Sequence, residues 1–190
     1  MATAYRSLLT EMNSSLLGLT LKNRYNIIKL LGKGGQCYVY LAFDTERQEE
    51  VVVKELIHKS KDQEIQEQNI ILFKKEYELL HRMDHKGLPK GYDYFQEKDR
   101  HFLVVEYVSG ENLKMILENK EIEFSEQQVI ELAIQMAEVL VYLSHMKPHQ
   151  VLIRDIKPAN IMLTPEGVIY FIDFTIARES DPSKTGDTVR

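Results

Sequence analysis

The chain has 190 residues, of which 44% are hydrophobic and 28% are charged, and its formal net charge is -5. A chain of this size can bury roughly 70% of its unfolded surface, which is enough for one domain or two small lobes. The acidic balance, with no segment rich in Lys and Arg, argues against nucleic acid or an anionic membrane as a partner. The single cysteine excludes an internal disulfide, and the lack of Cys/His pairs at ligand spacing excludes a structural zinc site. We therefore expect a cytoplasmic protein.

Residues 1–20 are predicted to form a loosely ordered arm, because they show weak periodicity and many small polar side chains. Arg6 is the only positive charge near the start, and the apolar patches are too short for a signal peptide. No segment approaches the length needed to span a membrane. We expect the functional part of the chain to begin after this arm.

Residues 24–43 predict two strands joined by the glycine-rich turn GKGGQ. The glycines Gly32, Gly34 and Gly35 would let backbone N–H groups approach phosphate oxygens closely. Taken alone, this motif is weak, and an ordinary hairpin turn explains it better.

The run EEVVVKEL predicts a buried strand that places the ammonium group of Lys54 at the edge of a pocket. Residues 61–83 then predict a helix with Glu76 on its apolar face. The expected apolar stripe consists of Leu72, Leu79, Leu80 and Met83. A charge on such a face is costly unless it is paired, so we expect a cationic partner for Glu76. A solvated helix face is the alternative.

Two further strands are expected in YDYFQ and RHFLVVEYV, after which SGENL opens a short helix. The longest predicted helix runs from Ser125 to His145 and begins with a capping box of Ser125 and Gln128. Its expected buried stripe consists of Val129, Leu132, Met136, Leu140 and Leu143. We interpret His145 and His149 as solvent-facing or capping residues rather than as general bases.

The segment VLIRDIKPAN spaces an aspartate, a lysine and an asparagine in a way that suits phosphoryl transfer. Asp155 can accept the proton of an attacking hydroxyl, Lys157 can neutralise charge on the transferred group, and Asn160 can hold Mg²⁺. Two short strands around a PEG turn would bring Asp173 back beside Asn160 as a second metal ligand. Taken alone, a turn containing Asp, Pro and Asn is more often ordinary loop chemistry.

In their order along the chain, these features resemble the protein kinase superfamily, whose catalytic loop reads H-R-D-x-x-x-x-N and whose magnesium motif reads D-F-G. The lysine two residues after Asp155 looks like the Ser/Thr branch, and the whole is similar to a bacterial eukaryotic-like Ser/Thr protein kinase. The resemblance implies an α+β, bilobal kinase-like fold. Its expected parts are a β-rich N-lobe with one helix (21–105), a hinge (106–110) and a partial C-lobe that ends in the activation loop (111–190).

The same resemblance implies that the chain binds ATP and Mg²⁺. The residues implied for the nucleotide are Gly32, Gly34, Gly35, Val39, Val52, Lys54, Glu106, Val108 and Met162. Among them, Lys54 would hold phosphates and pair with Glu76, while the backbone of Glu106 and Val108 would meet the adenine edge. Val105 would occupy the gatekeeper position. Asn160 and Asp173 would hold the metal, and Asp155 and Lys157 would act in catalysis.

The chain departs from the family pattern at several positions. Cys37 stands where the third glycine of the loop is expected, and Ile153 replaces the usual histidine. Thr175 follows Asp173 and Phe174 in place of glycine, so we expect a loop biased to one state. Arg154 can bind a phosphate placed on the activation loop.

The expected function is ATP-dependent phosphoryl transfer to Ser/Thr hydroxyls of an unidentified protein substrate. A pseudokinase, meaning a nucleotide-binding or scaffold module with little turnover, is the alternative, and the D-x-K-P-x-N signature disfavours a small-molecule kinase. The resemblance covers about the first two thirds of the family's domain. We therefore expect an uncovered C-lobe core and self-association through it.

Overall fold

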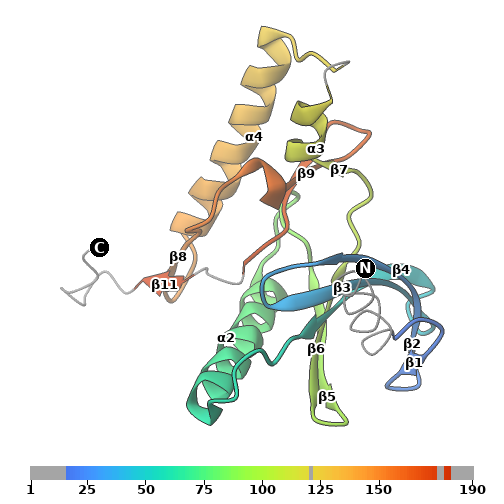
Figure 1. Ribbon diagram of the computed structural model, residues 1–190. Coiled ribbons are helices and arrows are strands. Elements are labelled where there is room, and N and C mark those ends of the chain that lie inside the picture. Colours follow the sequence, from blue (N-terminus) through green and yellow to red (C-terminus); the bar gives the residue numbers. More distant parts are fainter. Residues whose placement is uncertain (1–15, 120–121, 175–177, 181–190) are drawn as a thin grey trace, which may run out of the picture. The chain divides into compact units, whose positions relative to one another are not determined.

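The computed structural model describes residues 16–119, 122–174 and 178–180, the last range by its backbone alone. The chain divides into two compact units, one of Met1–Ile70 with Tyr92–Tyr107 and one of Ile71–Gly91 with Val108–Arg190 (Figure 1). We call these the first and the second unit. One of the divisions between these units falls between Ile70 and Ile71, within a helix. The lobe boundaries expected from the sequence stay a prediction.

The first unit contains a six-stranded sheet in the order β1-β2-β3-β4-β6-β5. Its strands are β1 (Thr20–Leu21), β2 (Tyr25–Lys33), β3 (Cys37–Asp44), β4 (Glu49–Leu56), β5 (Gly91–Glu97) and β6 (Arg100–Glu106). The expected strands β2 to β6 are all present, because each is rich in β-branched or aromatic residues and is bounded by turn residues. The two-residue turn between β5 and β6 places Lys98 and Asp99 at positive φ angles of 50° and 59°, which suits a tight hairpin.

One face of this sheet carries the core of the first unit. Alternate residues of the central strands point to it, and it includes the fully buried aromatic rings of Tyr25, Tyr40 and Phe102. Leu16 is 2% exposed and belongs to the same core, and Gly18 donates its N–H to the carbonyl of Ile27 at 3.1 Å. The chain is therefore packed against the sheet from residue 16. The sequence predicted that the loosely ordered arm would extend to residue 20. Residues 1–15 lie outside the described part of the chain.

Helix α2 (Gln63–Arg82) begins in the first unit and ends in the second. Leu79, Leu80 and Met83 are buried as predicted, and Glu76 is buried on the same side. Leu72 was predicted wrongly, because it is 44% exposed while its neighbour Phe73 is 2% exposed. Phe73, Glu76 and Leu80 follow the spacing i, i+3, i+7, so the inward face of α2 includes Phe73 in place of Leu72.

Helix α4 (Glu126–Ser144) is the main element of the second unit (Figure 1). The predicted capping box is present, with the hydroxyl of Ser125 accepting the N–H of Gln128 and the Gln128 side chain accepting the N–H of Ser125. The predicted stripe is only partly right: Leu143 is buried, whereas Val129 and Leu140 are exposed. The inward side of the helix instead follows Leu132, Gln135, Val139 and Leu143, since it packs on β10 and on the turn at Gly87.

Short elements complete the second unit. They are β7 (Glu111–Asn112), α3 (Leu113–Glu118), β8 (Gln150–Leu152), the 3-10 turn η1 (Pro158–Asn160), β9 (Ile161–Leu163), β10 (Ile169–Phe171) and β11 (Arg178–Ser180). The strands pair as β10-β9-β7 and as β11-β8. Gly110 has a φ of +157°, and a Cβ there would lie 2.3 Å from the carbonyl oxygen of Leu163. Only glycine therefore permits β7 to approach β9 so closely. Within the described residues, no helix is both long enough and apolar enough to cross a bilayer.

Candidate active site

The sheet register of the first unit brings together residues that lie far apart in the sequence. Gly32 of β2 lies opposite Val39 of β3, and Val39 lies opposite Lys54 of β4. Directly opposed residues of antiparallel strands point to the same face, so Val39 and Lys54 share one face beside the glycine turn. This row places the candidate phosphate-binding turn next to the candidate phosphate-binding lysine.

The same face carries the predicted adenine contacts of the first unit. Val52 lies two residues before Lys54 and opposite Val105, so all three side chains lie on one side of the sheet. Val51, Val53 and their neighbours point to the opposite side, into the aromatic core. Lys54 is 8% exposed, whereas Val39 and Val52 are half-buried. The sheet thus separates a packed core from a face that is partly open.

The glycine-rich turn joins β2 to β3. Gly34 donates its N–H to the carbonyl of Cys37 at 2.8 Å, which closes the turn. A Cβ added at Gly32 or at Gly35 would meet nothing within 4 Å, so open space lies beside the backbone at both positions. Backbone of this kind fits the close approach of phosphate oxygens. Cys37 is buried and lies on the same strand face as Val39, two residues away.

In the second unit, a hydrogen-bonded network holds the carboxylate of Asp155. The Nζ of Lys157 lies 2.5 Å from Asp155 Oδ2, and the Nδ2 of Asn160 lies 3.1 Å from the same oxygen. Asn160 Nδ2 also donates to the backbone carbonyl of Asp155 at 3.0 Å. Asn160 is 9% exposed, because the η1 turn, which begins at Pro158, folds it inward. The three residues predicted from VLIRDIKPAN are therefore in direct contact.

Asp173 is tied to this network through the backbone. The N–H of Ile172 donates to the carbonyl of Asn160 at 3.0 Å, which fixes the residue before Asp173 beside Asn160. On its other side, Phe174 is 1% exposed and anchors the chain in the core. β10 leads into this segment through its antiparallel pairing with β9, as the strands around the PEG turn predicted. Asp173 thus lies next to the Asp155 network.

Gly87 supports this arrangement, and the sequence reasoning missed it. Its carbonyl accepts the N–H of Phe171 at 3.0 Å, two residues before Asp173. A Cβ at Gly87 would lie 2.6 Å from Cγ2 of Val139, so the turn fits against α4 only with glycine. The glycine before Leu88 and Pro89 was the available signal, but it looked like an ordinary turn.

Electrostatics link Lys157 to two carboxylates. The hydrogen bond to Asp155 raises the pKa of Lys157, with further contributions from the charges of Asp155 and Asp173. Lys157 is exposed and therefore stays fully protonated at neutral pH. Its ammonium group therefore carries a positive charge that the charges of both aspartates favour.

The remaining predicted residues lie in several places. Glu76 of the second unit is 1% exposed on α2. A buried charge is costly unless it is paired, so this burial agrees with the expectation that Glu76 has a partner. Met162 is half-buried on β9, opposite Tyr170 of β10. Glu106 ends β6 opposite Val51, and Val108, in the second unit, is 9% exposed. The part that each residue plays in ligand binding stays a prediction.

The positions that depart from the family pattern behave differently from one another. Ile153 is half-buried and Arg154 is exposed. Thr175 lies outside the described residues, so its expected effect on the loop stays a prediction.

His145 is the C-cap of α4, and its Nδ1 donates to the carbonyl of Val141 at 2.8 Å, which confirms the capping interpretation. His149 is half-buried.

Comparisons with known proteins agree with this geometry. The family model for the protein kinase domain matches residues 25–190. The chain is 36% identical over 170 residues to a probable serine/threonine-protein kinase of Clostridium acetobutylicum, covering 88% of this chain and 24% of that protein. It is 34% identical over 164 residues to the serine/threonine-protein kinase PrkC of Bacillus subtilis, covering 85% of this chain and 24% of PrkC. The chain thus spans about a quarter of the length of these relatives.

A solved structure, PpkA-294 in its apo form, has a TM-score of 0.76 to this chain at 21% identity. The match covers 85% of this chain and 62% of that one, and at this identity it shows the fold alone. The predicted kinase-like fold and the predicted family are both confirmed by these matches. By the kinase-domain match over residues 25–190 and the similarity to bacterial serine/threonine kinases, this chain belongs to the protein kinase family.

Proposed function

We propose that the protein transfers the terminal phosphoryl group of ATP to Ser or Thr hydroxyls of a protein substrate. The observation that carries this proposal is the network of Asp155, Lys157 and Asn160, to which Ile172 ties Asp173. Phosphoryl transfer relies on positioning and on charge stabilisation, and this network supplies an oriented carboxylate, a cation and an amide within hydrogen-bonding distance. The relatives named above are Ser/Thr kinases and support the choice of hydroxyl acceptor.

We assign the nucleotide to the partly open face of the sheet in the first unit. The space beside Gly32 and Gly35 fits phosphate oxygens that approach the backbone N–H groups. Lys54, on the same face, would hold the phosphates by its ammonium group. Val39 and Val52 would cover the adenine from this side, since both are apolar and half-buried there. The backbone of Glu106, also in the first unit, would meet the adenine edge, and the roles of Val108 and Met162 at the nucleotide stay predictions.

We assign Mg²⁺ to Asn160 and Asp173, whose carbonyl and carboxylate oxygens are ligands of the kind this ion prefers. The Nδ2 of Asn160 is engaged by Asp155, which turns the amide so that Oδ1 is the atom left to the metal. When bound, the ion neutralises charge on the phosphates. The backbone bond from Ile172 to Asn160 supports this assignment, because it holds the residue before Asp173 beside Asn160.

We assign the proton of the attacking hydroxyl to Asp155. Both hydrogen bonds to its carboxylate end on Oδ2, so Oδ1 is the oxygen that accepts the proton. Lys157, held at Oδ2 by its ammonium group, would balance negative charge on the group being transferred. Glu76 is buried on α2, and its pairing with Lys54 stays a prediction.

The outer side of α4 supports a further proposal, that copies of this chain associate. Ile130, Ile134 and Val141 are exposed at the spacing i, i+4, i+11 and form one apolar side of the helix. The opposite side carries Val139 and Leu143, which are buried, so α4 has an apolar surface on both sides. An exposed apolar side of a helix is often covered by a partner, and we propose that a second copy covers this one.

A direct assay separates the kinase from the pseudokinase alternative. Cys37 and Thr175 favour the pseudokinase, because they stand where the family pattern has glycines. The protein, in its longest natural form, is incubated with labelled ATP and Mg²⁺, and label is measured on itself and on a generic Ser/Thr substrate. Label on Ser or Thr that requires Mg²⁺ supports the kinase. ATP binding without transfer to either acceptor would replace our proposal with the pseudokinase.

A further inference from the structure

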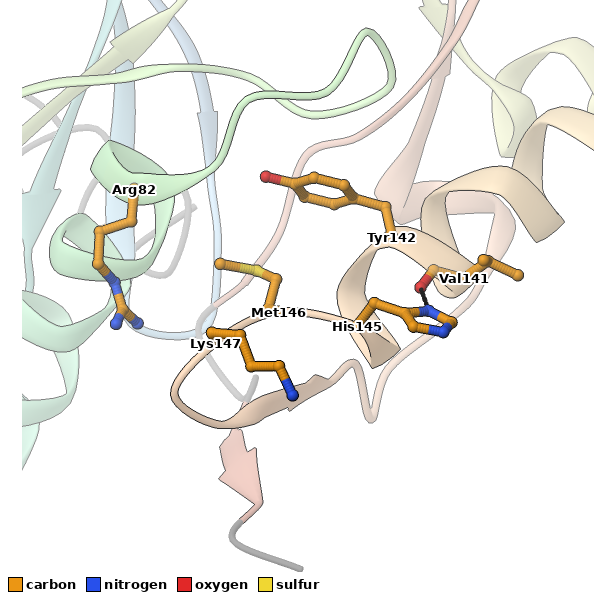
Figure 2. A pocket seen from close by; sticks show the side chains of 6 residues that line it. All are labelled: Arg82, Val141, Tyr142, His145, Met146 and Lys147. Atoms are coloured by element: carbon orange, nitrogen blue, oxygen red, sulfur yellow. Dashed lines mark hydrogen bonds between the residues drawn. The ribbon is translucent and has the colours of Figure 1, made fainter.

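A hollow of about 520 Å³ lies in the second unit, where the end of α2 meets the end of α4. It is lined by Arg82, Val141, Tyr142, His145, Met146 and Lys147. Figure 2 shows Arg82 of α2 on one side, Tyr142 on α4, His145 at the end of that helix, and Met146 and Lys147 on the loop that follows. We call these residues the α2–α4 hollow. None of them belongs to the site assigned to phosphoryl transfer.

The α2–α4 hollow is cationic although the chain as a whole is acidic. Arg82 and Lys147 contribute positive charges, His145 adds one when protonated, and no carboxylate is among its lining residues in the described part of the chain. Two carboxylates in neighbouring positions are engaged by lysines outside it. Glu138 pairs with Lys86 at 2.9 Å and Asp84 pairs with Lys90 at 3.6 Å. A negatively charged ligand would therefore meet attraction in the hollow.

Two of these cationic side chains are held in place by backbone acceptors. Arg82 donates its Nε–H to the carbonyl of Glu78 at 3.2 Å, one turn earlier on α2. His145 donates its Nδ1–H to the carbonyl of Val141 at 2.8 Å, drawn as the dashed line in Figure 2. Because Nδ1 is engaged, Nε2 is the ring nitrogen that can meet a ligand. Ordering these groups beforehand lowers the entropy that binding must offset.

The wall between the cations is apolar. Met146 and Tyr142 are half-buried, and the ring of Tyr142 is held in place because its hydroxyl accepts the N–H of Asp84 at 2.8 Å. Met is a flexible and polarisable side chain that adapts to apolar ligands. The hollow thus combines an apolar wall with flanking cations, which suits a ligand that is both acidic and apolar.

We propose that the α2–α4 hollow is a docking site for an acidic segment of a partner protein, with one large apolar side chain against Met146 and Tyr142. The cations sit at the ends of two helices rather than along a stripe, so they match a short peptide better than an extended polyanion such as nucleic acid. The net charge of -5 also opposes an extended polyanion. A carboxylate of the peptide would meet Lys147 beside the apolar contact.

The test measures binding of short fluorescent peptides by anisotropy at low and at physiological salt. The probe peptide contains only Glu and Leu, and its controls contain Lys and Leu or Glu and Gly. The variants are Lys147→Glu and Met146→Ala, with Lys114→Glu as matched control, because Lys114 is also exposed but lies on α3 outside the hollow. Circular dichroism establishes that each variant is folded.

We expect the Glu/Leu peptide to bind more tightly than either control peptide, with affinity that falls as salt rises. Lys147→Glu should weaken binding at least about tenfold, Met146→Ala should weaken it severalfold, and Lys114→Glu should leave it unchanged. Transfer of phosphate to a generic substrate should be the same in all variants. Equal affinity in wild type and Lys147→Glu, equal binding of the Lys/Leu peptide, or inorganic phosphate that displaces the probe as well as a peptide does would each overturn the assignment.

Discussion

The side-chain nitrogen of Asn160 donates both to the backbone carbonyl of Asp155, at 3.0 Å, and to its carboxylate, at 3.1 Å. One amide therefore fixes the backbone and the side chain of the proposed proton acceptor together. The same Asn160 accepts the N–H of Ile172 through its own carbonyl. Asn160 thus links the proposed base to the segment that carries the second proposed metal ligand.

This relationship predicts that Asn160→Ala lowers phosphate transfer by at least about 100-fold, because the oriented carboxylate and a metal ligand are lost together. Asn160→Asp should behave differently, since it keeps an oxygen for the metal but loses the N–H donors to Asp155. We expect it to transfer poorly at a Mg²⁺ requirement close to that of the wild type. Rates measured over a series of Mg²⁺ concentrations separate the two effects. If Asn160→Ala transfers phosphate at the wild-type rate, Asn160 does not position Asp155.

Lys54→Met is expected to weaken ATP binding about tenfold or more, because a charge-assisted hydrogen bond contributes roughly 1.5–3 kcal/mol and about 1.4 kcal/mol is tenfold in affinity. Lys54 is buried, and Met keeps most of its length, so the fold should tolerate the change. Lys29→Met on β2 is the matched control, since Lys29 is exposed on the same sheet. Calorimetric titration with ATP and Mg²⁺ checks both variants. Unchanged affinity in Lys54→Met would remove Lys54 from the site.

A third prediction concerns stability in acid. Asp44 is fully buried, and it accepts two hydrogen bonds from Arg24 and one each from the backbone N–H groups of Glu46 and Arg47. Burial by itself would raise the pKa of Asp44, but these hydrogen bonds outweigh it and hold the pKa below the ordinary value of 3.8. The folded state therefore gains stability from Asp44 above pH 3.8, and this stability is lost as the pH falls through the folded pKa.

Asp44→Asn should accordingly lower the free energy of unfolding by about 2 kcal/mol at neutral pH, as hydrogen bonds to a charged group are lost. Below pH 3.8 the difference from the wild type should shrink. Glu49→Gln is the control, because the Arg47–Glu49 pair lies at the surface and should contribute less than about 0.5 kcal/mol. Denaturant unfolding at several pH values measures both. A difference that stays constant down to strongly acidic pH would contradict the role given to Asp44.

The exposed side of α4 predicts self-association that one charge can disrupt. Ile134 is 54% exposed in the middle of that side, so Ile134→Glu should shift the chain toward monomer in sedimentation experiments. Ile71→Glu on α2 is the matched control, because Ile71 is 53% exposed on another helix. A wild-type chain that sediments as a monomer, or an equal shift in both variants, would rule out this surface.

Much of the fold was predictable because local patterns determine it. The strands that became β3 and β4 are continuous β-branched and aromatic runs, and the capping box at Ser125 marked the start of α4 within one residue. The face that a helix buries was less predictable. Leu72 and Phe73 are adjacent, and only tertiary packing decides that Phe73 points inward.

Within the site, too, the local contacts were predictable and the long-range contacts were not. The spacing of Asp155, Lys157 and Asn160 is local, so the sequence revealed it. The carbonyl of Gly87 that receives the N–H of Phe171 could not be predicted, because it joins segments far apart through backbone atoms that any residue carries. Short strands such as β7 and β11 were missed for a related reason, since strands of two or three residues exist only through their partners.

The most direct test of the proposed function compares phosphate transfer and ATP binding in wild type and in Asp155→Asn, which keeps the shape of the side chain but removes the proton acceptor. We predict that transfer falls by about 100- to 10,000-fold, the usual contribution of a general base, while the affinity for ATP with Mg²⁺ stays within about twofold. Transfer by Asp155→Asn at the wild-type rate, with equal ATP affinity, would contradict the assignment of Asp155 as the proton acceptor.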